Sequence, residues 1–395
     1  MGTIAERGGV PSTPGACLME EQKIAFLIRS LDVAGAERQL AYLARGLKDK
    51  GISVTVGIFY RGGGLEELLL SNDVPIVYLE KRGRWDILGF LIRTQAWVRR
   101  EKPNVLHGYL TGANIVVILL KPFFHSLYIV WGVRASNMLL ENYDKLARFT
   151  FKLSVWLAGF TDLIIVNSNS GYDYHAANGY PSDQMVVIPN GIDTNLFAPD
   201  LSARQHQRAL WGIDEGATLI GIVGRLDPMK DHRTFLQAAS KVLSKRKDVL
   251  FVCVGGGDIK YLEDLQQYSE GLGLSDNIRW LPGQVDVENA YNALDVLVST
   301  SAFGEGFSNT LAEAMACGVR CIATNVGDAE KILLDTGVVV PPGNSSAVAD
   351  GILALLDCSN RENSKFKKLA RDHIRKNYSI DQLVSNTLNV FKNRL

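Results

Sequence analysis

Two glutamates, Glu305 and Glu313, lie eight residues apart in the glycine-containing segment 303–318, FGEGFSNTLAEAMACG. The apolar run at 295–300 is typical of a buried strand, and Ser308 followed by helix-forming residues predicts the start of a helix. The turn between strand and helix leaves backbone N–H groups unpaired, and such groups attract phosphate. Because carboxylates repel phosphate, we expect the two glutamates to bind sugar hydroxyls at the two ends of a sugar diphosphate.

Two cations follow a second strand-like run. Residues 219–224 are typical of a buried strand, and Arg225 and Lys230 come shortly after it. In an open α/β sheet, ligands bind outside the carboxyl ends of the strands, where an Arg and a Lys neutralise a diphosphate. Taken singly, each motif has an ordinary alternative, because most glutamates are solvated and many cations lie on surface loops.

With both motifs in this order, the sequence closely resembles the retaining glycosyltransferases of the GT-B type, family 4 (glycosyl transferases group 1). The resemblance covers almost all of 23–395. It rests on SLDVAGAER at 30–38, PNGID at 189–193, Gly-Arg-Leu at 224–226 with Lys-Asp at 230–231, and the Glu-x7-Glu pattern.

The resemblance implies an α/β GT-B fold, in which two Rossmann-like, doubly wound domains face each other across a cleft. It places an acceptor domain at 21–198, joined by a terminal helix at 379–395 that crosses back, and a nucleotide-sugar donor domain at 199–378. We expect 1–20 to be a disordered lead-in. The implied activity is a hexosyltransferase-type reaction that retains the anomeric configuration and needs no metal. The implied acceptor is a glycan or glycolipid in cell-surface polysaccharide or lipopolysaccharide biosynthesis.

The resemblance also assigns roles to residues. Arg225 and Lys230 are expected to offset the charge of the leaving diphosphate, Glu305 to hold the donor hexose and Glu313 the ribose; the first three form the expected catalytic set. The residues expected to bind the donor are Gly35, Gly224, Arg225, Lys230, Glu305, Gly306, Phe307, Ser308, Asn309 and Glu313. A donor phosphate oxygen is expected to take the acceptor proton. No Asp-x-Asp pair follows a strand, so the scheme requires no metal ion, and no cofactor is implied.

The sequence departs from the family pattern at two places. Ala34 precedes Gly35 where a second glycine is commoner, although Gly35 still follows the first strand. The segment WGVRASN at 131–137 has no histidine, which many relatives carry there. Its candidates for acceptor or sugar contacts are Arg134, Ser136 and Asn137, and the alternative for Arg134 is a salt bridge at a domain edge.

Strand-like and helix-like segments alternate in the manner of a doubly wound fold. The first series of expected strands is 24–28, 54–59, 76–79, 105–107, 128–131, 163–166 and 186–188. The second series is 219–223, 250–254, 278–281, 296–299, 320–323 and 338–340. Between the two series, the polar segment 200–207 is the best candidate linker. A helix is expected at 231–244, and an amphipathic one at 380–391.

Composition fits a globular two-domain protein. The chain has 395 residues, 47% hydrophobic and 21% charged, with a formal net charge of zero, so it has no overall attraction to nucleic acid. The five cysteines are few and odd in number, which is typical of a reducing cytoplasm. The first twenty residues lack the apolar core of a signal peptide. No Cys/His cluster has zinc spacing.

Basic residues gather in the first half of the chain. The segments 81–102 and 145–156 combine Lys and Arg with aromatic residues, which suits an anionic membrane surface or a diphosphate-lipid acceptor. The alternative is a solvated helix face with its aromatics turned to the core. We therefore expect a cytoplasmic protein that docks on the inner face of the cell membrane if these faces bind lipid.

Two other functions stay open. A glycoside hydrolase would use Glu305 and Glu313 as acid and nucleophile, about 5–9.5 Å apart, but would leave Arg225 and Lys230 without a task. A non-catalytic nucleotide-sugar-binding protein would keep the binding residues without turnover. The donor sugar, its base and the acceptor depend on loop shapes that these patterns do not specify.

Overall fold

The computed structural model describes residues 22–83, 85–134, 136, 145–283, 286–358 and 360–394. The chain divides into two compact units. One consists of the described residues up to Trp131 with those from Leu388 onward, and the other is Gly132–Thr387. The boundary falls within strand β5 (Tyr128–Val133).

A seven-stranded sheet has the order β3-β2-β1-β4-β5-β6-β7. Besides β5, its strands are β1 (Lys23–Ile28), β2 (Ser53–Ile58), β3 (Ile76–Tyr78), β4 (Val105–Tyr109), β6 (Leu163–Val166) and β7 (Met185–Val187). The connecting helices are α2 (Gly35–Asp49), α3 (Glu66–Leu70), α4 (Ile87–Glu101), α5 (Leu110–Leu120), η1 (Lys121–Phe123), α6 (Lys145–Ala158) and α7 (Asn169–Ala177). The pairs β1–β2, β1–β4 and β6–β7 are parallel.

A six-stranded sheet has the order β10-β9-β8-β11-β12-β13. Its strands are β8 (Thr218–Val223), β9 (Val249–Val254), β10 (Ile278–Leu281), β11 (Val296–Ser299), β12 (Arg320–Thr324) and β13 (Val338–Val340). The helices are α8 (Leu201–Leu210), η3 (Pro228–Lys230), α9 (His232–Lys245), α10 (Ile259–Gly271), α11 (Val287–Ala293), α12 (Asn309–Ala316), α13 (Ala329–Leu333), η4 (Leu334–Thr336), α14 (Ser345–Leu356), α15 (Asn360–Asn377) and α16 (Ile380–Arg394).

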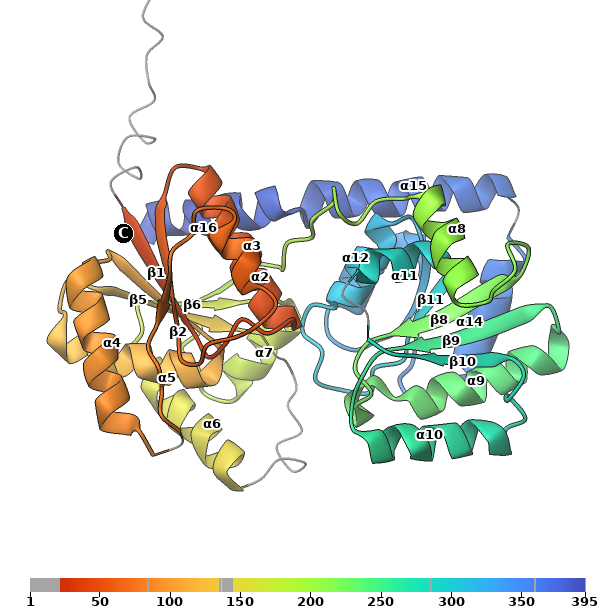
Figure 1. The fold of residues 1–395 in the computed structure, drawn as a ribbon, viewed down its shortest axis with the longest axis horizontal. Helices are drawn as coiled ribbons and strands as arrows, with labels where there is room; N and C mark the ends of the chain where they lie inside the picture. The colour runs from red at the N-terminus through yellow and green to blue at the C-terminus, as the bar shows by residue number, and fades with distance from the viewer. Residues whose placement is uncertain are drawn as a thin grey trace, which may run out of the picture. The chain divides into compact units, whose positions relative to one another are not determined.

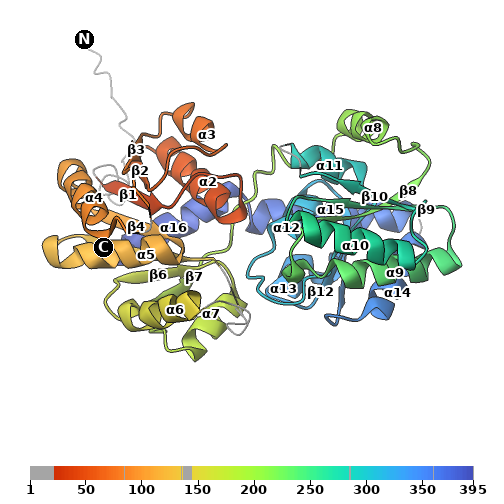
Figure 2. The same cartoon turned by 60° about the horizontal axis from the view of Figure 1, so that its bottom comes forward.

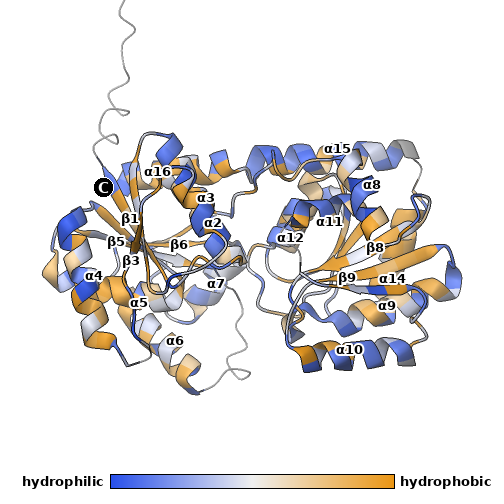
Figure 3. Ribbon diagram, viewed as in Figure 1, coloured by the Kyte–Doolittle hydropathy of each residue, from blue (hydrophilic) through white to orange (hydrophobic). Residues whose placement is uncertain are grey.

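Helices cover both faces of the six-stranded sheet, as Figure 1 and Figure 2 show. Leu219 and Val223 of β8 pack with residues of α11, α12, α13 and α15, whereas Ile220 and Ile222 pack with α9, α10 and α14. Successive side chains of a strand point to opposite faces, so a strand covered on both sides must be apolar at nearly every position. In Figure 3 the strands are accordingly mostly hydrophobic, while the helices carry both colours.

The doubly wound α/β architecture predicted from the sequence is confirmed. All thirteen expected strands are present, with ends that shift by at most two residues. The expected linker at 200–207 is wrong, because this segment forms most of α8. The Asp200 side chain accepts a hydrogen bond from Ala203 N–H at 2.9 Å and caps the helix. The polar pattern does not reveal the helix, because α8 buries polar side chains such as Gln207 and, next to it, Arg208.

Helix α15 leads into α16, and the last turns of α16 belong to the same compact unit as β1–β4. No helix in the described ranges combines the length and the apolar character needed to cross a membrane.

Candidate functional site

The strand order of the six-stranded sheet reverses between β8 and β11. From β8 the chain continues to β9 and β10 on one side, and from β11 to β12 and β13 on the other. The connections therefore leave in opposite directions at the carboxyl ends of these two strands. Doubly wound folds bind ligands in the crevice outside such a reversal, and we refer to this edge of the sheet as the crevice. The residues that follow β8 and β11 are those carrying the two motifs singled out in the sequence.

The loop after β8 is anchored to the loop after β11. The buried Thr300 hydroxyl donates to the carbonyls of Lys230 and Asp231, at 2.9 and 3.0 Å, and Ala302 N–H donates to Met229 O at 2.8 Å. Asp231 has a left-handed φ of 46° and caps α9, since its carboxylate accepts from Thr234 N–H at 3.1 Å and from the Thr234 hydroxyl at 2.6 Å. Asp tolerates this conformation better than most residues do.

Lys230 and Glu305 meet at this crevice. The Lys230 ammonium donates to Glu305 Oε1, and Ser301 Oγ donates to the same oxygen at 3.0 Å. Both side chains of the ion pair are largely but not completely buried. A cation and a carboxylate are thus held side by side at the carboxyl ends of β8 and β11. The cation is suited to bind phosphate, and the carboxylate is suited to bind sugar hydroxyls.

The turn between β11 and α12 requires glycine. Gly304 has a φ of 77°, and a Cβ there would lie 2.7 Å from Met229 Sδ. A Cβ on Gly306 would lie 2.7 Å from Asn167 Oδ1 and 2.9 Å from Ser168 Oγ. Only a residue without a side chain fits the first position without strain.

Ser308 precedes α12 but makes no side-chain cap, and its buried hydroxyl has no hydrogen-bond partner among the described residues. Buried polar groups normally have partners, and the start of a helix also offers backbone N–H groups to an anion, so a phosphate bound here would find both kinds of donor. Phe307 beside it is buried in the core. This supports the expectation that Ser308 contacts the donor.

Glu313 lies one turn into α12 and is only 2% exposed. Its Oε2 accepts a hydrogen bond from Tyr291 Oη at 2.8 Å. Tyr291, on α11, was missed in the sequence because the segment VENAYNA has no feature that marks it. A ribose would have to share Glu313 with this tyrosine.

The remaining predicted site residues are spread around the crevice. The Arg225 side chain is 74% exposed, with Asp227 Oδ2 at 3.6 Å as an ion-pair partner. Gly224 has a φ of 153° and runs beside Lys230, whose Cε would lie 3.5 Å from an added Cβ.

Within the second unit, hydrogen bonds join Ser136 and Arg134 to the segment between β11 and α12, for Arg134 through Asn190. The Ser136 hydroxyl donates to the backbone carbonyl of Glu305. Arg134 Nη1 donates to Asn190 Oδ1 at 3.2 Å, and Asn190 Nδ2 donates to Asn309 Oδ1 at 2.8 Å. Asn190, in the PNGID segment, was not among the predicted site residues, although that segment carried the resemblance.

Two predicted residues remain, Asn137 and Gly35. Asn137 lies outside the described residues. Gly35 begins α2 in the first unit, directly after β1, where the seven-stranded sheet has its own reversal between β1 and β4.

His232, next to the Lys230–Asp231 pair, is buried. Burial, together with the nearby Lys230 charge, lowers the pKa of His232 to about 4, although Asp231 and Asp227 act in the opposite direction. The imidazole is therefore neutral near pH 7 and adds no charge to the crevice.

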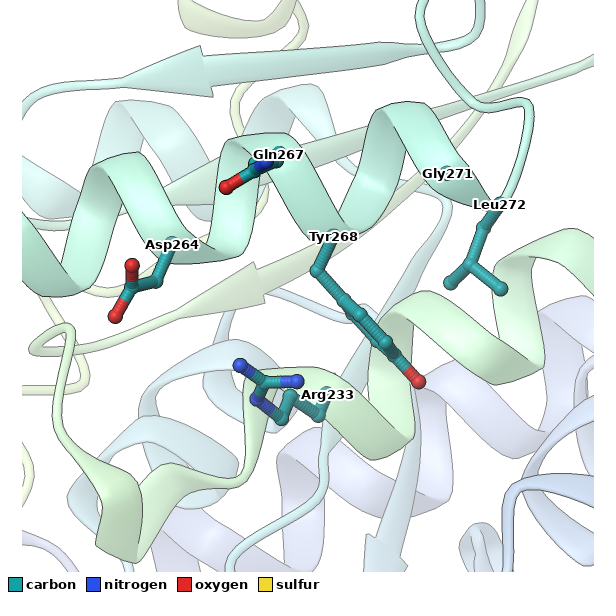
Figure 4. Close-up of a pocket in the computed structure, with 6 residues that line it drawn as sticks. All are labelled: Arg233, Asp264, Gln267, Tyr268, Gly271 and Leu272. Atoms are coloured by element: carbon teal, nitrogen blue, oxygen red, sulfur yellow. The ribbon is translucent and has the colours of Figure 1, made fainter.

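A cavity of about 480 Å³ lies elsewhere, between α9 and α10 (Figure 4). The Arg233 guanidinium covers the Tyr268 ring there at 4.6 Å. None of the predicted site residues lines it. Over the described ranges, no group of three or more His, Cys, Asp or Glu side chains is arranged to hold a metal ion.

The two doubly wound sheets, with an ion pair and a glycine turn at a strand-order reversal, define a protein of the GT-B class. Residues 33–196 match the model of Glycosyltransferase Family 4, and residues 203–373 match that of Glycosyl transferases group 1. Together these matches span most of the chain, which belongs to this family of glycosyltransferases.

Two named relatives match part of this chain. The D-inositol 3-phosphate glycosyltransferase of Paenarthrobacter aurescens (strain TC1) is 32% identical over 185 residues, 45% of each chain. The lipopolysaccharide core biosynthesis mannosyltransferase LpsB of Rhizobium meliloti (strain 1021) is 29% identical over 204 residues, 50% of this chain and 57% of that one. The chain thus spans about half the length of these relatives.

The crystal structure of Anabaena Alr3699/HepE in complex with UDP and glucose has the same fold, with a TM-score of 0.83. The sequences are 22% identical, and the likeness covers 94% of this chain and 99% of that one.

Proposed function

We propose that this protein transfers a hexose from a nucleoside-diphosphate sugar to a glycan or lipid-linked acceptor, with retention of the anomeric configuration and without a metal ion or cofactor. The donor binds to 199–378 and the acceptor to 21–198, completed by 379–395. The observation that carries this proposal is the Lys230–Glu305 pair at the β8–β11 reversal, next to the unsatisfied hydroxyl of Ser308.

In the proposed reaction the donor lies with its diphosphate beside Lys230 and the turn at Gly306–Ser308. As the bond between C1 and the phosphate oxygen breaks, negative charge develops on the leaving diphosphate. The Lys230 ammonium and the backbone N–H groups of the turn stabilise that charge. The exposed Arg225 side chain adds a further positive charge when it turns toward the diphosphate. The acceptor oxygen bonds to C1 on the same face, and a phosphate oxygen takes its proton.

Glu305 has two tasks in this scheme. It holds Lys230 in place before the donor arrives, and it accepts hydrogen bonds from the hexose hydroxyls through its remaining lone pairs. A preorganised ion pair costs little reorganisation during the reaction. The glycosidase alternative is weaker, because Glu313 is buried under Tyr291 and Glu305 is tied to Lys230.

The acceptor is proposed to be lipid-linked, in polysaccharide or lipopolysaccharide synthesis at the cytoplasmic face of the membrane. This rests on the outer face of α6, which we define as Lys145, Arg148, Phe149, Lys152 and Trp156. All five are exposed, Phe149 by 63% and Trp156 by 66%. The sequence of α6 contains three basic residues and no acidic one. Exposed aromatics interleaved with cations suit the interface of an anionic membrane.

The test is donor binding followed by transfer. UDP-glucose is the first donor to try, because a protein of the same fold holds UDP and glucose; GDP- and ADP-sugars follow. A donor at about a hundred times its dissociation constant should stabilise the protein by about 2.7 kcal/mol. Radiolabelled sugar should then pass to a lipid extract, and the anomeric configuration of the product is read by NMR.

Binding without transfer to any lipid or glycan acceptor would instead establish a nucleotide-sugar-binding protein. Release of sugar from a simple glycoside without a nucleotide would establish a hydrolase.

A further inference from the structure

A second cavity lies at the amino ends of β11 and β12, the edge of the sheet opposite the Lys230–Glu305 crevice. It has a volume of about 580 Å³, and its lining includes Arg204, Asp295, Lys367 and Lys368. A smaller cavity of about 240 Å³ adjoins it, shares Arg204, Asp295 and Lys367, and adds Arg320. We call the two together the amino-edge cavity. Ligand pockets are typically about 300–1,000 Å³, so it has the size for a small molecule.

Of the three acidic residues that line this cavity, Asp200, Glu215 and Asp295, the last is already fully engaged. Asp295 Oδ1 accepts from Arg204 Nη2 at 2.8 Å, and its Oδ2 accepts from Arg208 Nη2 at 2.7 Å and from Leu219 N–H at 2.8 Å. One negative charge thus faces two guanidinium groups. Arg208 is completely buried and also holds backbone carbonyls, so its role is structural.

Two other cations of the cavity, Lys367 and Arg320, have no carboxylate as an ion-pair partner among the described residues. Within the described residues, Lys367 makes no hydrogen bond and no ion pair, although its side chain is half-buried. Arg320 donates to Asn363 Oδ1 at 3.3 Å and lies over the Phe366 ring at 4.8 Å, while its buried Nε has no acceptor. Burying the Arg320 Nε–H group without an acceptor is costly, and an anion bound beside Lys367 and Arg320 would offset both positive charges.

The electrostatics of Lys367 agree with this geometry. Burial lowers the pKa of the Lys367 ammonium, Arg204 and Arg320 lower it further, and Asp295 opposes them. The acidic side chains nearby do not balance the charge. Asp200 lines the larger cavity but caps α8, and Glu215 lines the smaller one but is exposed to solvent.

We propose that the amino-edge cavity binds a small phosphorylated ligand, with Lys367 and Arg320 as the anchors of its phosphate and Arg204 beside them. Arg and Lys are the residues that recognise phosphate, the first through a planar fork and the second as a point charge. The site is separate from the donor crevice, and the proposal does not depend on the proposed transfer reaction. Its ligand is either free phosphate or a phosphate ester small enough for the cavity.

Calorimetric titration of the full chain with inorganic phosphate, pyrophosphate and a hexose phosphate tests the proposal. We expect wild-type protein to bind at least one of these anions, and Lys367→Met to weaken that binding by about tenfold or more, as loss of one charge-assisted hydrogen bond implies. Lys365→Met is the matched control, because Lys365 is exposed on the same helix and lines neither cavity. Tighter binding of the hexose phosphate assigns a phosphate ester, and equal affinities assign free phosphate.

The donor crevice also attracts phosphate, so Lys230→Ala is measured alongside. It should keep the anion binding that Lys367→Met loses. The proposal is overturned if no anion binds to wild-type protein, if Lys230→Ala abolishes binding and Lys367→Met does not, or if the two α15 variants behave alike.

Thermal unfolding gives a second readout that does not depend on calorimetry. In the absence of anions, Lys367→Met should raise Tm, because it removes a half-buried cation from the neighbourhood of two arginines. Phosphate should raise the Tm of the wild type and leave that of Lys367→Met nearly unchanged. A lower Tm for Lys367→Met, with the phosphate shift retained, contradicts an anion site at Lys367.

Discussion

At the scale of single residues, the ion pair between Lys230 and Glu305 decides how the candidate site works. Each charge offsets the other, so neither is left unpaired at these largely buried positions. A donor would meet both at once, with its phosphate on the cation and its sugar on the carboxylate. Removing one partner therefore does more than delete a contact, because the other is left uncompensated.

The first residue-scale prediction concerns Lys230. In Lys230→Ala, turnover with saturating donor should fall by about a hundredfold or more, as is typical when one preorganised donor to a developing anion is lost. Steady-state kinetics measure this, with Lys260→Ala, an exposed lysine on α10, as the control. A Lys230→Ala rate within a factor of two of the wild type removes Lys230 from the mechanism.

A second prediction separates the two glutamates. Glu313→Gln should weaken binding of the free nucleoside diphosphate, because Glu313 is assigned to the ribose and is already bonded to Tyr291. Glu305→Gln should leave nucleotide binding nearly intact and impair sugar transfer. Calorimetry on both variants, with transfer assays beside it, gives the answer. Equal losses of nucleotide affinity contradict this division of roles.

A third prediction follows from His232. Its folded-state pKa of about 4 lies below the unfolded value near 6.5, so the unfolded chain binds the extra proton first. The free energy of unfolding should therefore fall as pH drops from about 6.5 to about 4, by up to roughly 3 kcal/mol. Urea titrations along this range should show a shallower fall in His232→Gln. His206→Gln, at an exposed position, should retain the wild-type slope.

At the scale of elements, two strand-to-helix connections hold the site, and glycine makes one of them possible. Gly304→Ala should lower the free energy of unfolding by about 1–3 kcal/mol, since the φ of 77° is strained for alanine and Met229 must move. It should also reduce transfer, because Met229 adjoins Lys230. Denaturant unfolding checks the first effect. Gly112→Ala is the control, where an added Cβ meets nothing within 4 Å and should stabilise α5.

The sequence was sufficient for the elements and for part of the site. Strands covered on both faces leave an unmistakable apolar run, so β8 and β11 were found, and with them the crevice between their ends. Tyr291 and Thr300 were not found, because a hydrogen bond between separate elements leaves no periodic signal. The polar composition of 200–207 predicts a linker wrongly, because polar residues such as Gln207 are rarely buried as they are in α8. The domain limits at 198 and 199 stay a prediction.

At the scale of the whole molecule, a formal net charge of zero conceals uneven distribution. Most of the residues proposed to bind the donor lie at one edge of the six-stranded sheet, and the amino-edge cavity has surplus cations at the other. The outer face of α6 has three cations beside exposed aromatics and no acid. Long-range attraction to any polyanion is therefore weak, and binding to an anionic surface must come from such local faces.

The last prediction tests the outer face of α6 against membranes. Wild-type protein should sediment with anionic vesicles at low salt and come off as ionic strength rises, because each basic residue near such a surface contributes about 1 kcal/mol and is screened within ~10 Å at about 0.1 M. Reversal of Lys145, Arg148 and Lys152 to Glu should abolish sedimentation while donor affinity stays unchanged.

Trp156→Ala should weaken vesicle binding even at low salt, since its ring is 66% exposed and would lie among the headgroups. The matched control reverses the charges of Arg375, Lys376 and Lys392, which are also exposed, on α15 and α16. This control variant should sediment as the wild type does. If the α6 variant and the control variant both fail to sediment, vesicle binding reflects the total charge of the protein and not the outer face of α6. Wild-type protein that ignores anionic vesicles at low salt would make a water-soluble acceptor the better hypothesis.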